Sequence, residues 1–324
     1  MTGHPLKLIL MATLVGVLVT ACESEDRTKE DLMQSSSKST PLAPPVTRIE
    51  NVVDTHWGVQ VEDPYRWLED QDSQEVLHWF EQQGGFTEQV LNALPIRGQL
   101  LERLIELDQG APYSTYGVRQ LANGDIFFLR RNAGESLAKL YHQPKGAVEA
   151  TLLLDPDALA DDADSHASIE GYMPSWEGQY LVYGVAQGGS EETTYGVIDL
   201  TSGETLTETL TNIETAYNRP QWSLNGQGFY YSRRRELPVD APDTEIYKRT
   251  EVRYHAIGAD PTADVVVAAF GVSDRLALLE TDFPSIVITP GSDYAVLKVK
   301  HGDNNEISIF SAPLEKIRSG TVPW

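Results

Sequence analysis

Residues 219–232 read RPQWSLNGQGFYYS. A tryptophan precedes a short Ser-Leu-Asn-Gly turn, and a run of aromatic residues follows it. An Asn-Gly pair between apolar segments is a signal for a β-hairpin. Residues 174–183, PSWEGQYLVY, repeat the plan with a proline, a tryptophan, a glycine turn and a strand-forming run. The stretch therefore predicts a pair of antiparallel strands, and it predicts that the pair recurs along the chain.

The recurrence extends over most of the chain. Four turn glycines lie 54, 48 and 65 residues apart: Gly124, Gly178, Gly226 and Gly291. Repeats of roughly 40–50 residues that contain four short strands are typical of propeller blades. The uneven spacing indicates insertions, such as LPVDAPDTEIYKRT at 237–250. A β-sandwich is the alternative, but the recurrence of Trp176 and Trp222 beside a turn favours blades.

The preceding stretch has a helical period. Apolar side chains after Asp72-Ser73 recur at helical spacing: Val76, Leu77, Trp79 and Phe80. We expect Gly84-Gly85 to end this helix and Pro95 to divide the next stretch, up to residue 109, into two helices. So short a helical segment does not make a good core of its own, and we expect it to dock on a larger body.

The first 22 residues have a different character. Lys7 precedes the apolar run LILMATLVGVLVTA, which is too short to span a bilayer and is typical of a signal segment. The sequence Leu-Val-Thr-Ala-Cys at 18–22 resembles the lipobox of bacterial lipoproteins. This resemblance implies cleavage before Cys22, lipid on its sulfur and a location in the bacterial cell envelope, on either the outer or the inner membrane. An ordinary secretory signal cut near Ala21 is the alternative.

Composition excludes some functions. Hydrophobic residues make up 41% of the chain, which is enough for a substantial core, and Cys22 is the only cysteine, so no intrachain disulfide can form. The net charge of −23 argues against a nucleic-acid partner, because phosphates require a basic surface. Residues 23–47 are rich in serine and then in proline, which indicates a tether rather than a folded part.

One octapeptide identifies a family resemblance. Asp63-Pro-Tyr-Arg-Trp-Leu-Glu-Asp70, preceded by His56-Trp-Gly58, resembles the N-terminal signature of the prolyl oligopeptidase family. The resemblance continues over about residues 50–318, including LLLDPDAL at 152–159 and RYHAIGADP at 253–261. It implies a seven-bladed propeller, a separate α/β-hydrolase domain that holds the catalytic serine, and an N-terminal segment that wraps onto that domain. It also implies short proline-containing peptides as substrates and no cofactor.

Catalytic motifs are absent from the sequence itself. The α/β-hydrolase nucleophile requires Gly-x-Ser-x-Gly, and none occurs. The nearest stretches contain Ser136, Ser190 and Ser273: the first two are interpreted as turns, and the third has arginine where the motif requires its second glycine. The seven histidines are scattered, and the acidic run at 161–164 lacks the spacing of a calcium loop. We therefore expect no catalytic, cofactor-binding or metal-binding residue in this chain, and Cys22 is its one predicted modification site. By the family resemblance, Tyr217 and Val267 fall near stretches that face the substrate cavity, but neither is taken as a site residue.

These observations predict a mainly β fold. We expect a signal peptide at 1–21, a lipidated tether at 22–47, a helical segment at 48–109 and about four blades of the family's seven at 110–324. Two functions are open. The chain is either the propeller part of a prolyl oligopeptidase-like serine endopeptidase, inactive without its hydrolase domain, or a lipid-anchored propeller that binds a peptide or protein partner.

Overall fold

The computed structural model describes residues 43–160, 165–190, 192–273, 275–318 and 322–324. The predicted signal peptide, Cys22, most of the tether and the acidic run at 161–164 lie outside the described residues. The chain divides into two compact units, Met1–Gln99 and Leu100–Trp324, and each is described by itself.

The first unit opens with a hairpin that the sequence did not predict. Strands β1 (Val53–His56) and β2 (Val59–Glu62) pair antiparallel around a turn at Trp57-Gly58, and both turn residues have positive φ. A short 3₁₀ helix, η1 (Arg66–Glu69), follows. The segment predicted as helical over 48–109 therefore contains a two-stranded sheet ahead of its helices.

Helix α2 (Gln74–Asn92) starts where the sequence indicated but ends later. Ser73 caps it, because its hydroxyl accepts the backbone N–H of Glu75 at 3.2 Å. The prediction that Gly84-Gly85 ends the helix was wrong, since α2 continues through both glycines. Glycine costs only about 1 kcal/mol in a helix interior and keeps its backbone N–H, so it weakens a helix without stopping it. Pro95 does separate α2 from α3 (Arg97–Asp108), as predicted.

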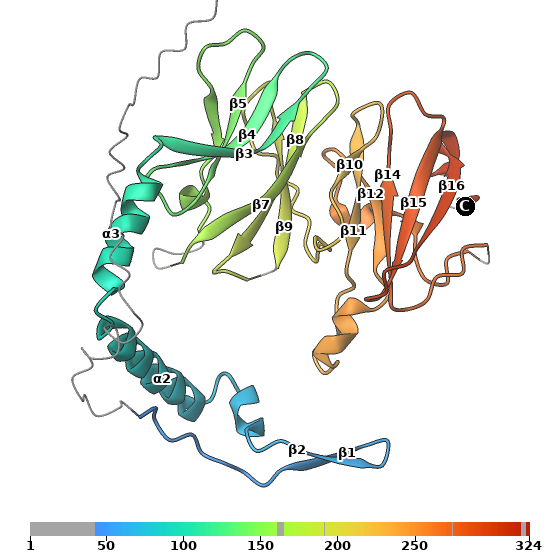
Figure 1. Cartoon of the computed structure of the whole chain (residues 1–324). Coiled ribbons are helices and arrows are strands. Elements are labelled where there is room, and N and C mark those ends of the chain that lie inside the picture. The colour runs from blue at the N-terminus through green and yellow to red at the C-terminus, as the bar shows by residue number, and fades with distance from the viewer. Residues whose placement is uncertain (1–42, 161–164, 191, 274, 319–321) are drawn as a thin grey trace, which may run out of the picture. The chain divides into compact units, whose positions relative to one another are not determined.

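The second unit consists of consecutive antiparallel sheets, which follow one another from green to red in Figure 1. The first contains β3 (Tyr113–Gln120), β4 (Ile126–Asn132), β5 (Lys139–Gln143) and β6 (Thr151–Leu154). The second contains β7 (Ala167–Pro174), β8 (Tyr180–Gln187) and β9 (Thr193–Asp199). The third contains β10 (Gln221–Trp222), β11 (Gly228–Arg233), β12 (Glu251–Ala256) and β13 (Val265–Ala268). The fourth contains β14 (Asp282–Val287), β15 (Tyr294–His301) and β16 (Ile307–Pro313).

Each of these sheets is an up-and-down blade, and the four turn glycines hold equivalent positions in them. Gly124, Gly178, Gly226 and Gly291 each lie between the first and second strand of a sheet, and all four have positive φ. A left-handed backbone at this turn favours glycine. In the second blade, residues 205–210 extend the sheet, because Tyr195 and Leu210 exchange backbone hydrogen bonds at 2.8 and 2.9 Å. The prediction of about four blades is confirmed.

The core lies between successive blades. One cluster joins the first blade to the second through Phe127, Leu140 and Leu181. A second cluster places Trp222 and Phe229 of the third blade against Val197 of the second. A third joins the third and fourth blades and includes Val252 and Leu297. Face-to-face packing of consecutive small antiparallel sheets, here of three or four strands, is the arrangement of a propeller rather than of a two-sheet sandwich. Within the described residues the sheets do not close on one another.

Candidate functional site

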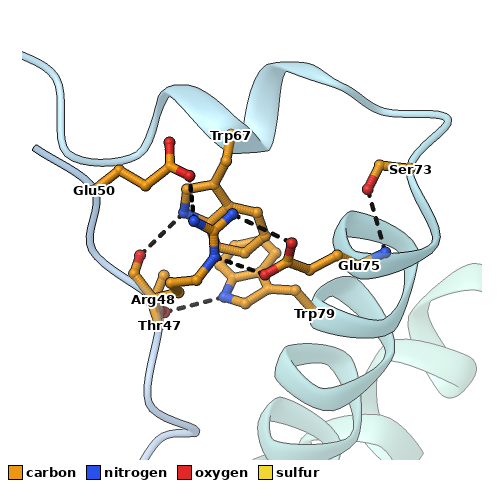
Figure 2. Close-up of polar contacts among 7 residues, drawn as sticks. All are labelled: Thr47, Arg48, Glu50, Trp67, Ser73, Glu75 and Trp79. Carbon is orange, nitrogen blue, oxygen red and sulfur yellow. Dashed lines mark hydrogen bonds and ion pairs between the residues drawn. The ribbon is translucent and has the colours of Figure 1, made fainter. Parts of the chain in front are cut away.

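Two tryptophans of the first unit are covered by the chain that precedes the hairpin (Figure 2). The Trp67 indole donates to the carbonyl oxygen of Arg48 at 3.0 Å, and the Trp79 indole donates to the Thr47 hydroxyl at 3.0 Å. The two indoles meet edge to face at 6.4 Å. Both indole N–H groups therefore have hydrogen-bond acceptors within the first unit, and each ring packs against the other. The Phe80 side chain stays 55% exposed.

Arg48 holds this cluster together electrostatically. Its guanidinium lies 4.6 Å from the centre of the Trp67 ring and pairs with Glu50 and with Glu75, the latter at 2.7 Å. The Glu50 and Glu75 carboxylates raise the pKa of Arg48 above its usual value. The cluster is a structural clasp between the extended segment and α2.

The serines in the three Gly-x-Ser stretches lie in connections between strands. Ser136 is in the turn between β4 and β5, Ser190 follows the glycines between β8 and β9, and Ser273 is in the loop after β13. None of the three follows a strand directly into a helix, which is the setting of an α/β-hydrolase nucleophile. The interpretation of the Ser136 and Ser190 stretches as turns is confirmed.

Sequence reasoning missed one serine–histidine pair. Asp282, His301 and Ser308 come from the three neighbouring strands β14, β15 and β16. The His301 Nδ1 atom lies 2.9 Å from an Asp282 oxygen, and its Nε2 atom lies 2.8 Å from the Ser308 hydroxyl. The three positions have no common motif spacing, so only the strand register brings them together.

A second histidine is enclosed in the third blade. His255 on β12 has 0% exposure, and its Nδ1 atom lies 2.8 Å from an oxygen of Asp264. The other oxygen of Asp264 accepts the Tyr231 hydroxyl at 2.7 Å. Burial first, and the hydrogen bond to Asp264 second, raise the pKa of Tyr231. The cluster lies in the blade interior and does not line the cavity described below. Among the described residues, no group of three or more His, Cys, Asp or Glu side chains could hold a metal ion.

A cavity of about 400 Å³ lies between the third and fourth blades. Three aromatic rings line it: Tyr217 from the loop before β10, Tyr247 from the insertion at 237–250, and Phe283 from β14. Tyr217 and Phe283 pack at 5.5 Å, and Tyr217 and Tyr247 are 44% and 55% exposed. The remaining lining residues are Glu214, Ala216, Thr244, Lys248, Thr281, Gly302 and Asp303. We call this cavity the aromatic pocket.

The loop that carries Tyr217 is fixed by its own hydrogen bonds. Buried Glu214 accepts the backbone N–H of Ala216 at 2.8 Å and donates its own N–H to the carbonyl of Ser232 on β11 at 3.0 Å. The Arg219 guanidinium donates to the carbonyl oxygens of Thr215 and Asn218 at 2.8 and 2.9 Å. Tyr217 is therefore held at the rim of the pocket by a loop whose backbone is anchored on both sides.

A charged edge flanks the aromatic rings. The Lys300 ammonium lies 5.0 Å from the centre of the Tyr217 ring, and Lys248 pairs with Glu245 at 2.5 Å. The hydrogen bond from Lys248 lowers the pKa of the Glu245 carboxyl. An apolar floor with a few charged groups at its edge is the usual make-up of a site for an apolar side chain of a small ligand or peptide.

Comparison with known proteins identifies the family to which the chain belongs. The family model "Prolyl oligopeptidase, N-terminal beta-propeller domain" matches residues 44–284. The chain belongs to the prolyl oligopeptidase family. The matched region covers residues 44–99 of the first unit, the first three blades and the start of the fourth, and it includes the three aromatic residues of the pocket.

Individual relatives of the chain are peptidases that match the same region. The chain is 24% identical over 276 residues to the prolyl endopeptidase of Elizabethkingia miricola, a match that covers 85% of this chain and 37% of the relative. It is 26% identical over 249 residues to dipeptidyl aminopeptidase BI of Pseudoxanthomonas mexicana, covering 72% of this chain and 32% of the relative. The chain thus spans about a third of the length of these relatives.

Solved structures of the prolyl oligopeptidase family have the same fold. A structure from a study of two prolyl endopeptidases, concerned with inter-domain dynamics in catalysis and specificity, is similar with a TM-score of 0.72 and 29% identity, over 84% of this chain and 38% of that one. Prolyl oligopeptidase B of Galerina marginata, bound to a 35-residue hydrolysis and macrocyclization substrate, has a TM-score of 0.69 at 19% identity. That likeness covers 84% of this chain and 39% of the other and concerns the fold alone.

Of the two positions that the family resemblance placed near the substrate cavity, only one lines a pocket. Tyr217 lines the aromatic pocket. Val267 is 1% exposed in the core between the third and fourth blades, and its carbonyl oxygen accepts the Trp324 indole N–H at 3.0 Å. The aromatic pocket itself was not predicted, because its walls come from four segments that are far apart in the sequence.

Proposed function

We propose that this chain is the N-terminal propeller part of a serine endopeptidase that cleaves short peptides after proline. In this proposal the blades restrict access to short, unfolded peptides, and a separate α/β-hydrolase domain supplies the serine nucleophile. Membership of the prolyl oligopeptidase family supports the reaction class. The absence of Gly-x-Ser-x-Gly from the 324 residues agrees with a nucleophile supplied by another domain.

The aromatic pocket is the observation that carries the proposal for substrate binding. A prolyl ring or another apolar side chain packs well against aromatic faces, and a peptide with proline loses little entropy on binding because its backbone is already restricted. Tyr217, Tyr247 and Phe283 offer such faces within a cavity of about 400 Å³. The pocket would therefore hold one apolar residue of the peptide while the rest of the peptide reaches the hydrolase domain.

The first unit has a surface suited to docking. Apolar side chains on and after α2 stay exposed within that unit, including Leu77 at 45%, Phe80 at 55% and Ile96 at 56%. Exposed apolar patches of this kind commonly mark an interaction site. In the proposal, the hydrolase domain is the body that covers them.

Binding and turnover can be tested separately. For residues 22–324 produced alone, we expect calorimetric titration with acetyl-Phe-Pro-Ala amide to show weak, saturable binding. Tyr217→Ala and Phe283→Ala should each weaken it about tenfold, since loss of a ring contact and its buried area removes on the order of 1–2 kcal/mol. Tyr294→Ala is the matched control, because Tyr294 is a 55% exposed tyrosine of the fourth blade that does not line the pocket. Equal affinities for all four proteins would refute the role of the pocket.

Turnover by the same protein should be undetectable. A fluorogenic peptide with proline before the reporter group should not be hydrolysed by residues 22–324, because the nucleophile belongs to the hydrolase domain in this proposal. Clear hydrolysis above a buffer control would contradict it.

We also propose that Cys22 carries lipid and anchors the chain to the bacterial cell envelope. The lipobox-like sequence at 18–22 supports this proposal. Labelling of expressing cells with an alkyne analogue of palmitate should mark the wild-type chain, and Cys22→Ala should abolish the mark and release the protein from the membrane fraction. An unlabelled wild-type chain would instead favour an ordinary secretory signal. In the part of the chain that the structure describes, no helix has the length and hydropathy to cross a bilayer.

A further inference from the structure

Three strands of the fourth blade hold a hydrogen-bonded relay of Asp282, His301 and Ser308. Asp282 and His301 are direct partners in the register of β14 and β15, and Ser308 faces Val299 in the register of β15 and β16. Asp282 is 2% exposed, and its second oxygen accepts the backbone N–H of Leu279 at 2.8 Å. The carboxylate is therefore fixed from two sides.

The geometry defines the direction of the hydrogen bonds. When the imidazole is neutral, the Nδ1–H of His301 donates to Asp282, because the carboxylate can only accept. The Nε2 lone pair is then left to accept the Ser308 hydroxyl at 2.8 Å. This order of groups is that of a Ser-His-Asp triad.

The surroundings do not suit nucleophilic catalysis. Ser308 is the second residue of a regular strand, whereas the α/β-hydrolase nucleophile sits on a strained turn that exposes its hydroxyl. Neither Ser308 nor His301 lines the aromatic pocket. The relay therefore has the hydrogen-bond order of a triad, but none of its three side chains lines the aromatic pocket.

The residues next to the relay do line that pocket. Thr281 and Phe283, on either side of Asp282, line the aromatic pocket. Gly302 and Asp303, which follow His301 directly, line it as well. The Asp282–His301 bond thus ties together the two chain segments that make up one wall of the pocket. Hydrogen bonds between buried or half-buried groups hold such segments in a single arrangement.

We propose that Asp282, His301 and Ser308 are positioning residues for the aromatic pocket. The relay fixes the distance between Phe283 and the turn at Gly302-Asp303, and through it the width of the pocket and its preference for a bulky apolar residue. This inference rests on the proposed peptide-binding function, and it adds the residues that determine specificity without touching the peptide.

The first test compares two peptides on residues 22–324. Wild type should bind acetyl-Phe-Pro-Ala amide more tightly than acetyl-Ala-Pro-Ala amide in calorimetric titration. His301→Ala should lower the affinity for the phenylalanine peptide by on the order of fivefold, which is the scale of one ordinary hydrogen bond lost, and should remove most of the preference for that peptide over the alanine peptide. His301→Asn should recover part of it, because its amide can still donate to Asp282. Ser308→Ala should have a smaller effect in the same direction.

His142→Ala is the matched control. The His142 Nε2 atom lies 3.3 Å from an oxygen of Asp125 in the first blade, so the substitution breaks a histidine–aspartate contact remote from the pocket. It should leave both affinities unchanged even if it lowers thermal stability as much as His301→Ala does. If His301→Ala and His142→Ala lost affinity equally, the effect would reflect a general loss of stability and not the relay, and the proposal would be overturned.

A second measurement works without peptide. Amide hydrogen exchange should become faster at residues 279–284 and 301–306 in His301→Ala and remain at the wild-type rate there in His142→Ala. If wild type binds neither peptide, the proposed function fails, and unchanged exchange in His301→Ala would overturn the relay independently. Covalent labelling of Ser308 by a fluorophosphonate probe, abolished by His301→Ala, would also overturn the positioning role, because it would make Ser308 a nucleophile.

Discussion

At the scale of single residues, Trp222 joins the third blade to the second. It is 1% exposed, its indole donates to the carbonyl of Met173 in the second blade at 2.9 Å, and its ring packs against Tyr180 and Phe229. One side chain thus contributes buried area and a hydrogen bond to the joint between two blades. Trp176 of the second blade donates back to the Trp222 carbonyl oxygen at 3.3 Å.

Trp222→Ala should therefore be strongly destabilising. We expect a loss of about 3–5 kcal/mol in the free energy of unfolding, the range for truncating a buried tryptophan. Urea unfolding followed by circular dichroism measures it. Val239→Ala, at a fully exposed side chain of the insertion, should stay within about 0.5 kcal/mol of wild type. A loss below about 1 kcal/mol at Trp222 would show that the blade joint is held by other contacts.

At the scale of elements, α2 contains a correctable weakness. Gly84 and Gly85 lie in its interior, and a Cβ added at either position would meet no atom within 4 Å. Alanine at each should stabilise the helix by about 1 kcal/mol, because it restricts the unfolded backbone. Slower amide exchange along α2 measures the gain.

The β1–β2 turn provides the control for that prediction. Gly58 also has open space around it, but its φ is +83°. Gly58→Ala should weaken the hairpin, since an L-residue there pays for a left-handed backbone. All three glycines have room for a Cβ, so the expected difference between them comes from backbone conformation, which is left-handed only at Gly58. Exchange that stays equally fast in Gly84→Ala and wild type would contradict the account of α2.

At the scale of the whole molecule, the blade interiors make stability fall at alkaline pH. Burial raises the pKa of Tyr172 to about 12 and also raises the pKa values of Tyr195, Tyr230 and Tyr231. In the unfolded chain these phenols ionise near pH 10. Above that pH the unfolded state binds fewer protons than the folded state, so stability is complete below about pH 10 and decreases as the pH rises toward 12.

Tyr172→Phe tests this dependence. Removing one such phenol should make the decrease between pH 9 and 11 shallower in urea unfolding, at a cost at neutral pH from the lost hydrogen bond to the Gly117 carbonyl. Parallel curves for the two proteins would show that Tyr172 ionises equally in both states.

Local pattern alone determined the class of fold and the strand pair that recurs in each repeat. Hairpin turns and helix caps depend on residues a few positions apart, so Gly226, Ser73 and Pro95 could be interpreted without a structure. The position of the end of α2 could not, because the cost of Gly84-Gly85 is comparable to the gain from neighbouring helical residues.

The location of the candidate site depends on contacts between residues that are far apart in the sequence. The aromatic pocket joins residues 214–217, 244–248, 281–283 and 302–303, and the relay joins Asp282, His301 and Ser308 across three strands. Such groupings depend on blade packing and on strand register, and a shift of register by one residue would turn each side chain to the opposite face. The repeating unit could be predicted without a structure, because a turn and its two strands involve residues that are close in the chain. The contacts between units decided which of its side chains share a pocket.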